Sequence, residues 1–254
     1  MEILVLKIEY DGTNYSGWQS QNNAHSVQSA LQNASTEIFG KKFSIIGSGR
    51  TDAAVHARGQ IAHSVLKDNI KLSQKQIPKA FNHYLNEDIK VINAKLLDKP
   101  FHAVRDAIQR EYSYSIHFIN SPLNRHFSTF LKFPYNKELL IKSAAVFIGE
   151  HDFTSFSKNN KDTESYICDV RKCYWEETGF EQYRLTIAAN RFVYGMVRAL
   201  TGAMLDIARG KRTIDEVTSA LSKKDRSLSS PHAPAKGLVL ERVNYPAHFG
   251  LDEF

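Results

Sequence analysis

The first part of the chain alternates between apolar patterns typical of strands and patterns typical of helices. Residues 3–10 combine apolar–polar alternation with β-branched side chains and run into a turn-forming Asp-Gly-Thr-Asn segment at 11–14, which predicts a strand and then a turn. Apolar side chains recur at helical spacing over residues 27–39. Ser26 precedes this stretch as an N-cap and Gly40 follows it as a stop, so it is predicted to form a helix.

Short apolar stretches and polar segments continue to alternate up to about residue 100. Strands are predicted at 43–46 and 60–66. They flank the polar segment 47–56, which is therefore expected to be a loop between strands. A helix near 74–85 and a strand at 89–97 complete the first half of the chain.

The second half uses the same kinds of element. In chain order they are a strand at 111–118, a helix at 137–148, strands near 168–177 and 182–189, a long helix from about 192 to 209, a helix capped by Thr213 and Glu216, and a strand at 238–245. This mixture predicts an α+β protein of two similar halves, each with a mostly antiparallel sheet and helices on one face. We expect the halves to be residues 1–104 and 105–254, with an active-site cleft between them.

Composition narrows the class of protein only slightly. The 254 residues are 42% hydrophobic and 11% aromatic, which describes a globular protein with a core and excludes general disorder. Lys plus Arg at 33 against Asp plus Glu at 27 gives a net charge of +6, which favours a polyanionic partner without requiring one. No apolar stretch reaches membrane-spanning length and no leader pattern precedes the first strand, so a cytoplasmic protein without membrane association is expected.

Reactive side chains are densest between residues 47 and 63. They are Arg50, Asp52, His56, Arg58 and His63. Loops held by rigid strands often carry function, but the spacing alone favours a structural role in which Asp52 caps a short helical turn. Cys168 and Cys173 imply neither a disulfide framework nor a zinc site. His56, His63 and His102 lack a close metal-ligand spacing, so no metal is predicted.

The segment 49–57 carries the most specific signal. It reads Gly-Arg-Thr-Asp-Ala-Ala-Val-His-Ala, is followed by Gly-Gln, and resembles the active-site motif of the tRNA pseudouridine synthase A family. Further segments resemble that family in the same order, at 10–19, 101–103, 110–114, 152–156 and 196–198. The resemblance implies the pseudouridine synthase fold and the isomerisation of uridine to pseudouridine in the anticodon stem-loop of tRNA, without a cofactor.

The resemblance also assigns roles to individual residues. Asp52 is implied as the essential carboxylate, acting as a nucleophile on ribose C1′ or adding to uracil C6. Arg198 is implied as its cationic partner, and Tyr112 as the residue that lies against the base and is a candidate for proton transfer. From the residues alone, a solvated helix arginine is the better explanation for Arg198. A core aromatic on a strand explains Tyr112 equally well.

Substrate binding is implied at the same loop. Arg50 matches the family arginine associated with flipping the uridine out of its stack. Arg58, with Lys41 and Lys42, is expected to belong to a basic surface that contacts phosphates. Trp18 is expected to pin its loop to the core, with stacking on RNA as the alternative. The family further implies a homodimer whose partner is the anticodon arm of tRNA.

Two positions depart from the family pattern. Ala54 stands where the family usually has glycine, and Val104 and Arg105 stand where Phe-His-Ala usually continues with Arg-Phe. These departures keep open a catalytically inactive RNA-binding or tRNA-folding protein on the same scaffold. The histidines together with Asp52 leave a metal-dependent phosphodiesterase as a more remote alternative.

Overall fold

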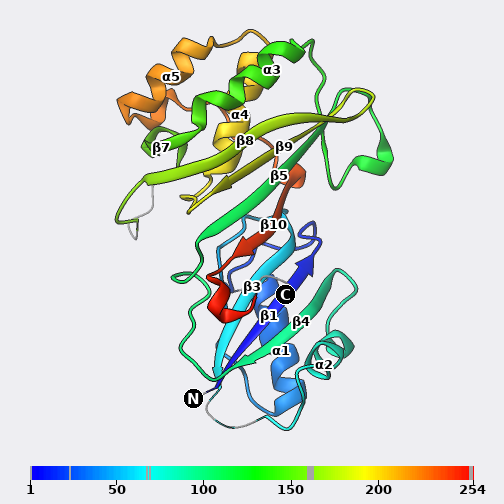
Figure 1. Cartoon of the computed structure of the whole chain (residues 1–254). Helices are drawn as coiled ribbons and strands as arrows, with labels where there is room; N and C mark the ends of the chain where they lie inside the picture. The colour runs from blue at the N-terminus through cyan, green and yellow to red at the C-terminus, as the bar shows by residue number, and fades with distance from the viewer. Residues whose placement is uncertain (1, 23, 67, 69, 159–162, 252–253) are drawn as a thin grey trace. The chain divides into compact units, whose positions relative to one another are not determined.

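The computed structural model describes residues 2–22, 24–66, 68, 70–158, 163–251 and 254 (Figure 1). The chain forms two compact units: Met1–Ile108 together with Val239–Phe254, and Gln109–Leu238. This division differs from the expected one, because the C-terminal segment belongs to the first unit. The physical reason is strand pairing: β10 (Leu238–Asn244) lies parallel to β3 (His56–Leu66), with Val239 opposite His56.

The first unit is built on a sheet in the order β4-β1-β3-β10, with β2 also paired to β3. The further elements are β1 (Glu2–Tyr10), β2 (Ile46–Gly47), β4 (Ile89–Leu97), α1 (Val27–Phe39) and α2 (Ile77–Tyr84). β1 pairs antiparallel with both β3 and β4 and supplies the centre of the core, where Leu4, Leu6 and Ile8 are buried. Figure 1 shows α1 and α2 beside these strands.

Local sequence signals in the first unit are largely confirmed. α1 spans the predicted residues, with the Ser26 side chain accepting from Ser29 N–H and Gly40 ending the helix in the left-handed conformation at φ 66°. The strand expected at 43–46 is reduced to the two residues of β2. β3 starts at His56 instead of residue 60, because its pairing with β1 continues to Tyr10 opposite Ala57.

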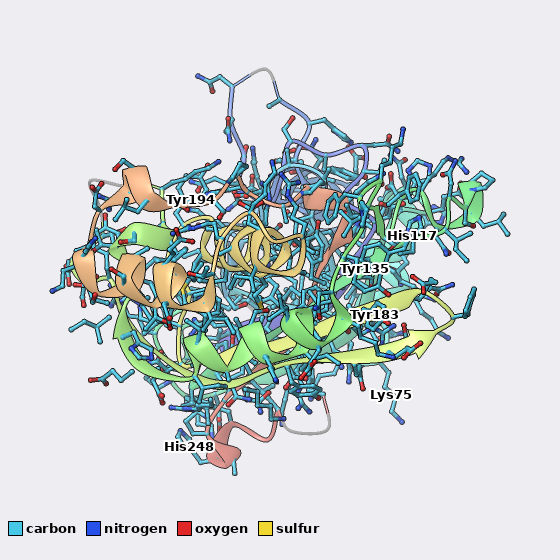
Figure 2. All side chains as sticks on the ribbon, turned by 90° about the horizontal axis from the view of Figure 1, so that it is seen from above. Lys75, His117, Tyr135, Tyr183, Tyr194 and His248 are labelled. Carbon is cyan, nitrogen blue, oxygen red and sulfur yellow. The ribbon has the colours of Figure 1, made fainter. Side chains whose placement is uncertain are left out.

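The second unit contains a sheet in the order β5-β9-β8-β7, with β6 parallel to β5. Its elements are β5 (Gln109–His117), β6 (Thr129–Phe130), β7 (Gly149–Asp152), β8 (Ile167–Gly179), β9 (Gln182–Ala189), α3 (Lys137–Ser143), α4 (Met196–Ala208) and α5 (Ile214–Lys223). The pairings β5–β9, β9–β8 and β8–β7 are antiparallel. Seen from the side and from above, the three helices cover one face of these strands (Figures 1 and 2). The expected α+β class is thus confirmed.

Helix boundaries in the second unit follow local stereochemistry. α5 begins at the predicted capping box, in which Thr213 and Glu216 satisfy each other's backbone N–H groups. α4 begins at Met196, later than expected, because Gly195 adopts φ 74° directly before it. The helix predicted at 137–148 ends at Ser143 and continues as a 3₁₀ turn, Ala144–Phe147. Across the described residues, no helix combines the length and apolar character needed to span a membrane.

Candidate active site

Asp52 lies at the start of a tight turn that leads into β3. The N–H of Val55 donates to the carbonyl oxygen of Asp52 at 3.2 Å, and β3 begins at the next residue, His56. Asp52 therefore does not cap a helical turn, which was the alternative interpretation of its spacing. Asp52 as a whole residue is half-buried, and its backbone is held by the turn.

The third residue of this turn is conformationally unusual. Ala54 has φ 61°, the left-handed region that the third position of a type II turn requires and that glycine adopts most readily. This is the position at which the motif resemblance implies glycine. Ala54 N–H also donates to the carbonyl oxygen of Tyr15 at 3.3 Å, so a neighbouring segment supports the turn.

The neighbouring segment, residues 10–18, lies directly against the Asp52 turn. Trp18 N–H donates to the carbonyl oxygen of Thr51 at 3.1 Å. Gly17 has φ 92°, and a Cβ there would lie 2.5 Å from the same Thr51 oxygen. A Cβ at Gly12 would overlap the carbonyl oxygen of Val55. Both glycines are therefore required by the close approach of two backbones.

Side chains add contacts at both ends of the turn. The Tyr10 hydroxyl lies 2.8 Å from Thr51 Oγ1. His56 Nδ1 lies 3.0 Å from Asp11 Oδ1 and 3.1 Å from the N–H of Gly12. Partial burial acts to raise the pKa of Asp11, but hydrogen bonds from Thr13 and the charge of His56 outweigh it, so the pKa of this carboxyl lies below its usual range.

Trp18 anchors the segment to the core. Its side chain is only 3% exposed, and a Cβ at Gly47 would lie 2.5 Å from the indole ring. The ring also lies 6.2 Å, centroid to centroid, from Tyr10. The predicted core role of Trp18 is thus confirmed, and stacking of its face on RNA is not supported.

A buried glutamine holds the other side of the loop. Gln60 Nε2 donates to the carbonyl oxygen of Gly49 at 2.9 Å, and Gln60 Oε1 accepts from the Ser48 hydroxyl at 2.7 Å. Sequence reasoning assigned Gln60 no role, although its place directly after the motif was a signal. The contact fixes the backbone just before Arg50, which is exposed.

Arg58 is engaged within the protein. One guanidinium nitrogen lies 3.2 Å from each carboxylate oxygen of Glu241 on β10. The Arg58 side chain is 58% exposed, so the ion pair is open to solvent and to competition from a phosphate.

The second unit holds the other two residues implied in catalysis. Tyr112 is buried on β5 opposite Ile187, and its ring meets Phe192 edge-on at 5.3 Å between centroids. Arg198 is half-buried in the first turn of α4. Its Nε donates to the carbonyl oxygen of Ala233 at 2.8 Å, and Ala233 N–H donates back to the Arg198 carbonyl oxygen at 3.0 Å. Arg198 is therefore a fixed side chain and not a freely solvated one.

His63, Cys168 and Cys173 are buried inside the protein. Burial, followed by the neighbouring His102, lowers the pKa of His63 to about 4, and His63 Nδ1 accepts from Ala103 N–H at 3.2 Å. Burial raises the pKa of Cys168 to about 11 and that of Cys173 to about 12. Within the described ranges, no group of three or more His, Cys, Asp or Glu side chains is arranged to hold a metal ion.

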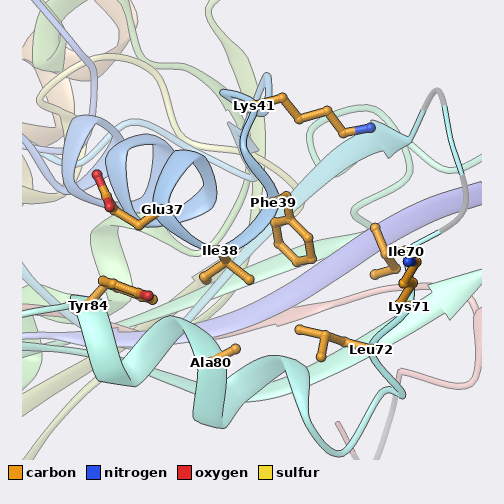
Figure 3. A pocket seen from close by; sticks show the side chains of 9 residues that line it. All are labelled: Glu37, Ile38, Phe39, Lys41, Ile70, Lys71, Leu72, Ala80 and Tyr84. Carbon is orange, nitrogen blue, oxygen red and sulfur yellow. The ribbon is translucent and has the colours of Figure 1, made fainter.

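An open pocket of about 510 Å³ lies elsewhere in the first unit (Figure 3). It is lined by Glu37, Ile38, Phe39, Lys41, Ile70, Lys71, Leu72, Ala80 and Tyr84. None of the residues implied in catalysis lines it. The pocket is a gap between the end of α1 and the face of α2, and we assign it no role in catalysis.

Comparison with known proteins identifies the family. A family model described as tRNA pseudouridine synthase matches residues 7–104 and 144–246. The chain is 38% identical over 248 residues to tRNA pseudouridine synthase A of Chlamydia trachomatis serovar A, covering 96% of this chain and 92% of that protein. It is 36% identical over 247 residues to the Thermoanaerobacter sp. (strain X514) protein of the same name, covering 96% and 100%.

One solved structure also shows a distant similarity. A chain from the crystal structure of a Cbf5-Nop10-Gar1 complex aligns with a TM-score of 0.34 and 10% identity, covering 80% of this chain and 54% of that one. This similarity is too low to establish a shared fold by itself.

The α+β fold, taken with these matches, defines an RNA-modifying isomerase of the pseudouridine synthase class. The family model spans most of the chain, and the relatives match over nearly its full length. The chain belongs to the tRNA pseudouridine synthase family.

Proposed function

We propose that this chain converts uridine to pseudouridine in the anticodon stem-loop of tRNA, with Asp52 as the nucleophile. The C1′–N1 bond breaks, the uracil turns, and a C1′–C5 bond forms, while C5 loses its proton and N1, which carries none in uridine, gains one. Substrate and product are isomers, so the reaction consumes no co-reactant and we propose no cofactor. The observation that carries the proposal is the half-buried residue Asp52 on a turn held by residues 10–18.

The carboxylate has two possible points of attack on the nucleoside. Attack at C1′ gives a covalent link to the ribose, whereas addition at C6 gives a link to the base. Both need Asp52 ionised and fixed in direction, since a nucleophile must approach its target atom along a defined line. The turn geometry and the contacts from residues 10–18 support a fixed direction.

The other site residues are proposed to support this step. Arg198 supplies a positive charge that favours the ionised carboxylate, and its hydrogen bond to Ala233 supports a fixed guanidinium. Tyr112 lies against the extruded base and is a candidate to move the proton from C5, and its burial beside Phe192 supports an apolar platform for a ring. Tyrosine would need a lowered pKa to act as a base.

Arg50 and Arg58 are proposed to bind the RNA. Extruding a stacked base costs on the order of a few kcal/mol, which contacts to phosphates can offset. The exposed Arg50 side chain is suited to fill the space the uridine leaves or to hold a phosphate. Arg58 would exchange Glu241 for a phosphate. The net charge of +6 supports a polyanionic partner, and we further propose that the protein is a cytoplasmic homodimer.

The proposal is tested with Asp52→Asn, which keeps the size of the side chain and removes its charge. Release of tritium from tRNA labelled at uridine C5 is measured together with tRNA affinity. Asp52→Asn should abolish release and leave affinity within about twofold. Asp98→Asn, at an exposed carboxylate outside the site, is the matched control and should release tritium normally. Normal turnover by Asp52→Asn would remove Asp52 from its assigned role.

The target nucleotides are tested separately by mapping pseudouridine in tRNA exposed to the purified enzyme. Modification in the anticodon arm that disappears with Asp52→Asn supports the proposed substrate. Modification confined to another arm of the tRNA would overturn the anticodon assignment and leave the isomerase chemistry standing.

A further inference from the structure

We propose that Tyr10 and His56 are positioning residues that hold the Asp52 turn from its two ends. The inference rests on the proposed role of Asp52 as the nucleophile. Tyr10 contacts Thr51, the residue directly before Asp52, through the 2.8 Å hydrogen bond between their hydroxyls. His56 is the first residue after the turn and contacts Asp11 and Gly12. Three consecutive residues, Tyr10 at the end of β1 and Asp11 and Gly12 directly after it, thus contact the turn at both of its ends.

The Tyr10–Thr51 and His56–Gly12 contacts are shielded from water, whereas the Asp11 side chain is 34% exposed. Tyr10, Thr51 and His56 are each buried, with 3%, 7% and 2% of their surface exposed. Buried hydrogen bonds act in a low local dielectric, and leaving one partner unsatisfied costs about 1–3 kcal/mol. The two contacts therefore oppose displacement of the backbone on either side of Asp52 more strongly than exposed contacts would.

The strand register brings the two segments together. Ile8 on β1 lies opposite Gln60 on β3, but Tyr10 lies opposite Ala57. Between these two pairs, one residue of β1 (Glu9) faces two of β3 (Arg58 and Gly59), which is the signature of a β-bulge. Bulges re-aim side chains and are common beside active sites. This bulge carries Gly59, where a Cβ would lie 2.5 Å from the carbonyl oxygen of Glu241.

His56 can hold its end of the turn in more than one protonation state. With a lone pair on Nδ1 the ring accepts from the N–H of Gly12, whereas with a proton on Nδ1 it donates to the Asp11 carboxylate. The two partners are adjacent in the chain. The ring is therefore tied to the end of β1 either way.

The turn needs this support because its own conformation is strained. Ala54 has φ 61°, and the backbone hydrogen bonds of the turn include those from Val55 N–H to the Asp52 carbonyl oxygen and from Ala54 N–H to the Tyr15 carbonyl oxygen. Loss of the Tyr10 contact would let Thr51, and with it the Asp52 carboxylate, shift. A displacement of about 1 Å at a reacting group costs on the order of 100-fold in rate.

The test is Tyr10→Phe, which removes one hydroxyl and keeps the buried ring. The matched control is Tyr245→Phe: Tyr245 is also 3% exposed, and its hydroxyl donates to the carbonyl oxygen of Ala103 at 2.7 Å, outside the Asp52 turn. For both variants we would measure kcat, KM for tRNA, tRNA affinity and the melting temperature. Both should lose similar stability, but only Tyr10→Phe should lower kcat, by about 10–100-fold, with KM within about twofold.

His56 is tested with His56→Asn, whose amide can place an acceptor or donor near the position of Nδ1, and with His56→Phe, which can do neither. Asn should retain more of the wild-type kcat than Phe when both folded variants are assayed well below their melting temperatures. Equal kcat values would contradict the role of His56.

Different results would contradict the role of Asp52 and the positioning role of Tyr10. If Asp52→Asn retains turnover, the proposed function itself is wrong. If Asp52→Asn is inactive but Tyr10→Phe has a kcat no lower than that of Tyr245→Phe, the positioning role of Tyr10 is overturned and the function of Asp52 stands. A lower kcat for Tyr10→Phe that returns to normal simply on cooling would also overturn it, because loss of stability would then explain the defect.

Discussion

Replacing Ala54 by glycine should stabilise the protein. A non-glycine residue in the left-handed conformation costs about 1–2 kcal/mol, and Ala54 is held there at φ 61°. Glycine removes this cost but loses about 0.5–1 kcal/mol more conformational entropy on folding than alanine does. The net gain for Ala54→Gly is therefore about 0.5–1 kcal/mol in the free energy of unfolding, which corresponds to roughly 1–4 °C in melting temperature for a chain of this size.

The neighbouring residue offers a matched control. Ala53 precedes Ala54 in the same turn and is not among the described residues with positive φ. Ala53→Gly should therefore destabilise the protein by about 0.5–1 kcal/mol, because it adds backbone entropy to the unfolded chain and relieves no strain. Urea denaturation and calorimetry of both variants give the two signs directly. If Ala54→Gly destabilises the protein as much as Ala53→Gly, the turn is not strained. The Asp52 loop would then not need support from Tyr10 and His56.

Two further predictions concern charge. The pKa of His63 is lowered to about 4, so at pH values below the ordinary histidine pKa the unfolded state binds a proton that the folded state does not. Stability should therefore fall as the pH drops from about 6.5 towards 4. The unfolding free energy of His63→Gln should depend less steeply on pH over this range. Equal slopes for the variant and the wild type would contradict a lowered pKa for His63. Arg58→Ala should change stability by less than about 1 kcal/mol, since its ion pair with Glu241 is exposed. If Arg58 binds a phosphate, the same variant should reduce the dependence of log tRNA affinity on log salt by about one unit, and an unchanged salt dependence would exclude the contact.

Local sequence signals predicted the elements whose boundaries depend on local chemistry. Ser26 and Gly40 delimit α1, and Thr213 begins α5, because caps act on backbone groups within one turn of the chain. Boundaries set by distant segments were missed. β3 extends to His56 because β1 is there to pair with it. A strand's hydrogen bonds are made by another segment, so its ends are not encoded locally.

The sequence by itself determined which residue types lie at the Asp52 loop, since the motif at 49–57 is contiguous and specific. Tertiary structure alone decided what each of them contacts. Tyr10 reaches Thr51 across 41 residues of chain, and Arg58 pairs with Glu241 across 183. Such contacts follow from strand register and from the return of β10 to the first unit, and both arise from long-range packing that no local pattern specifies.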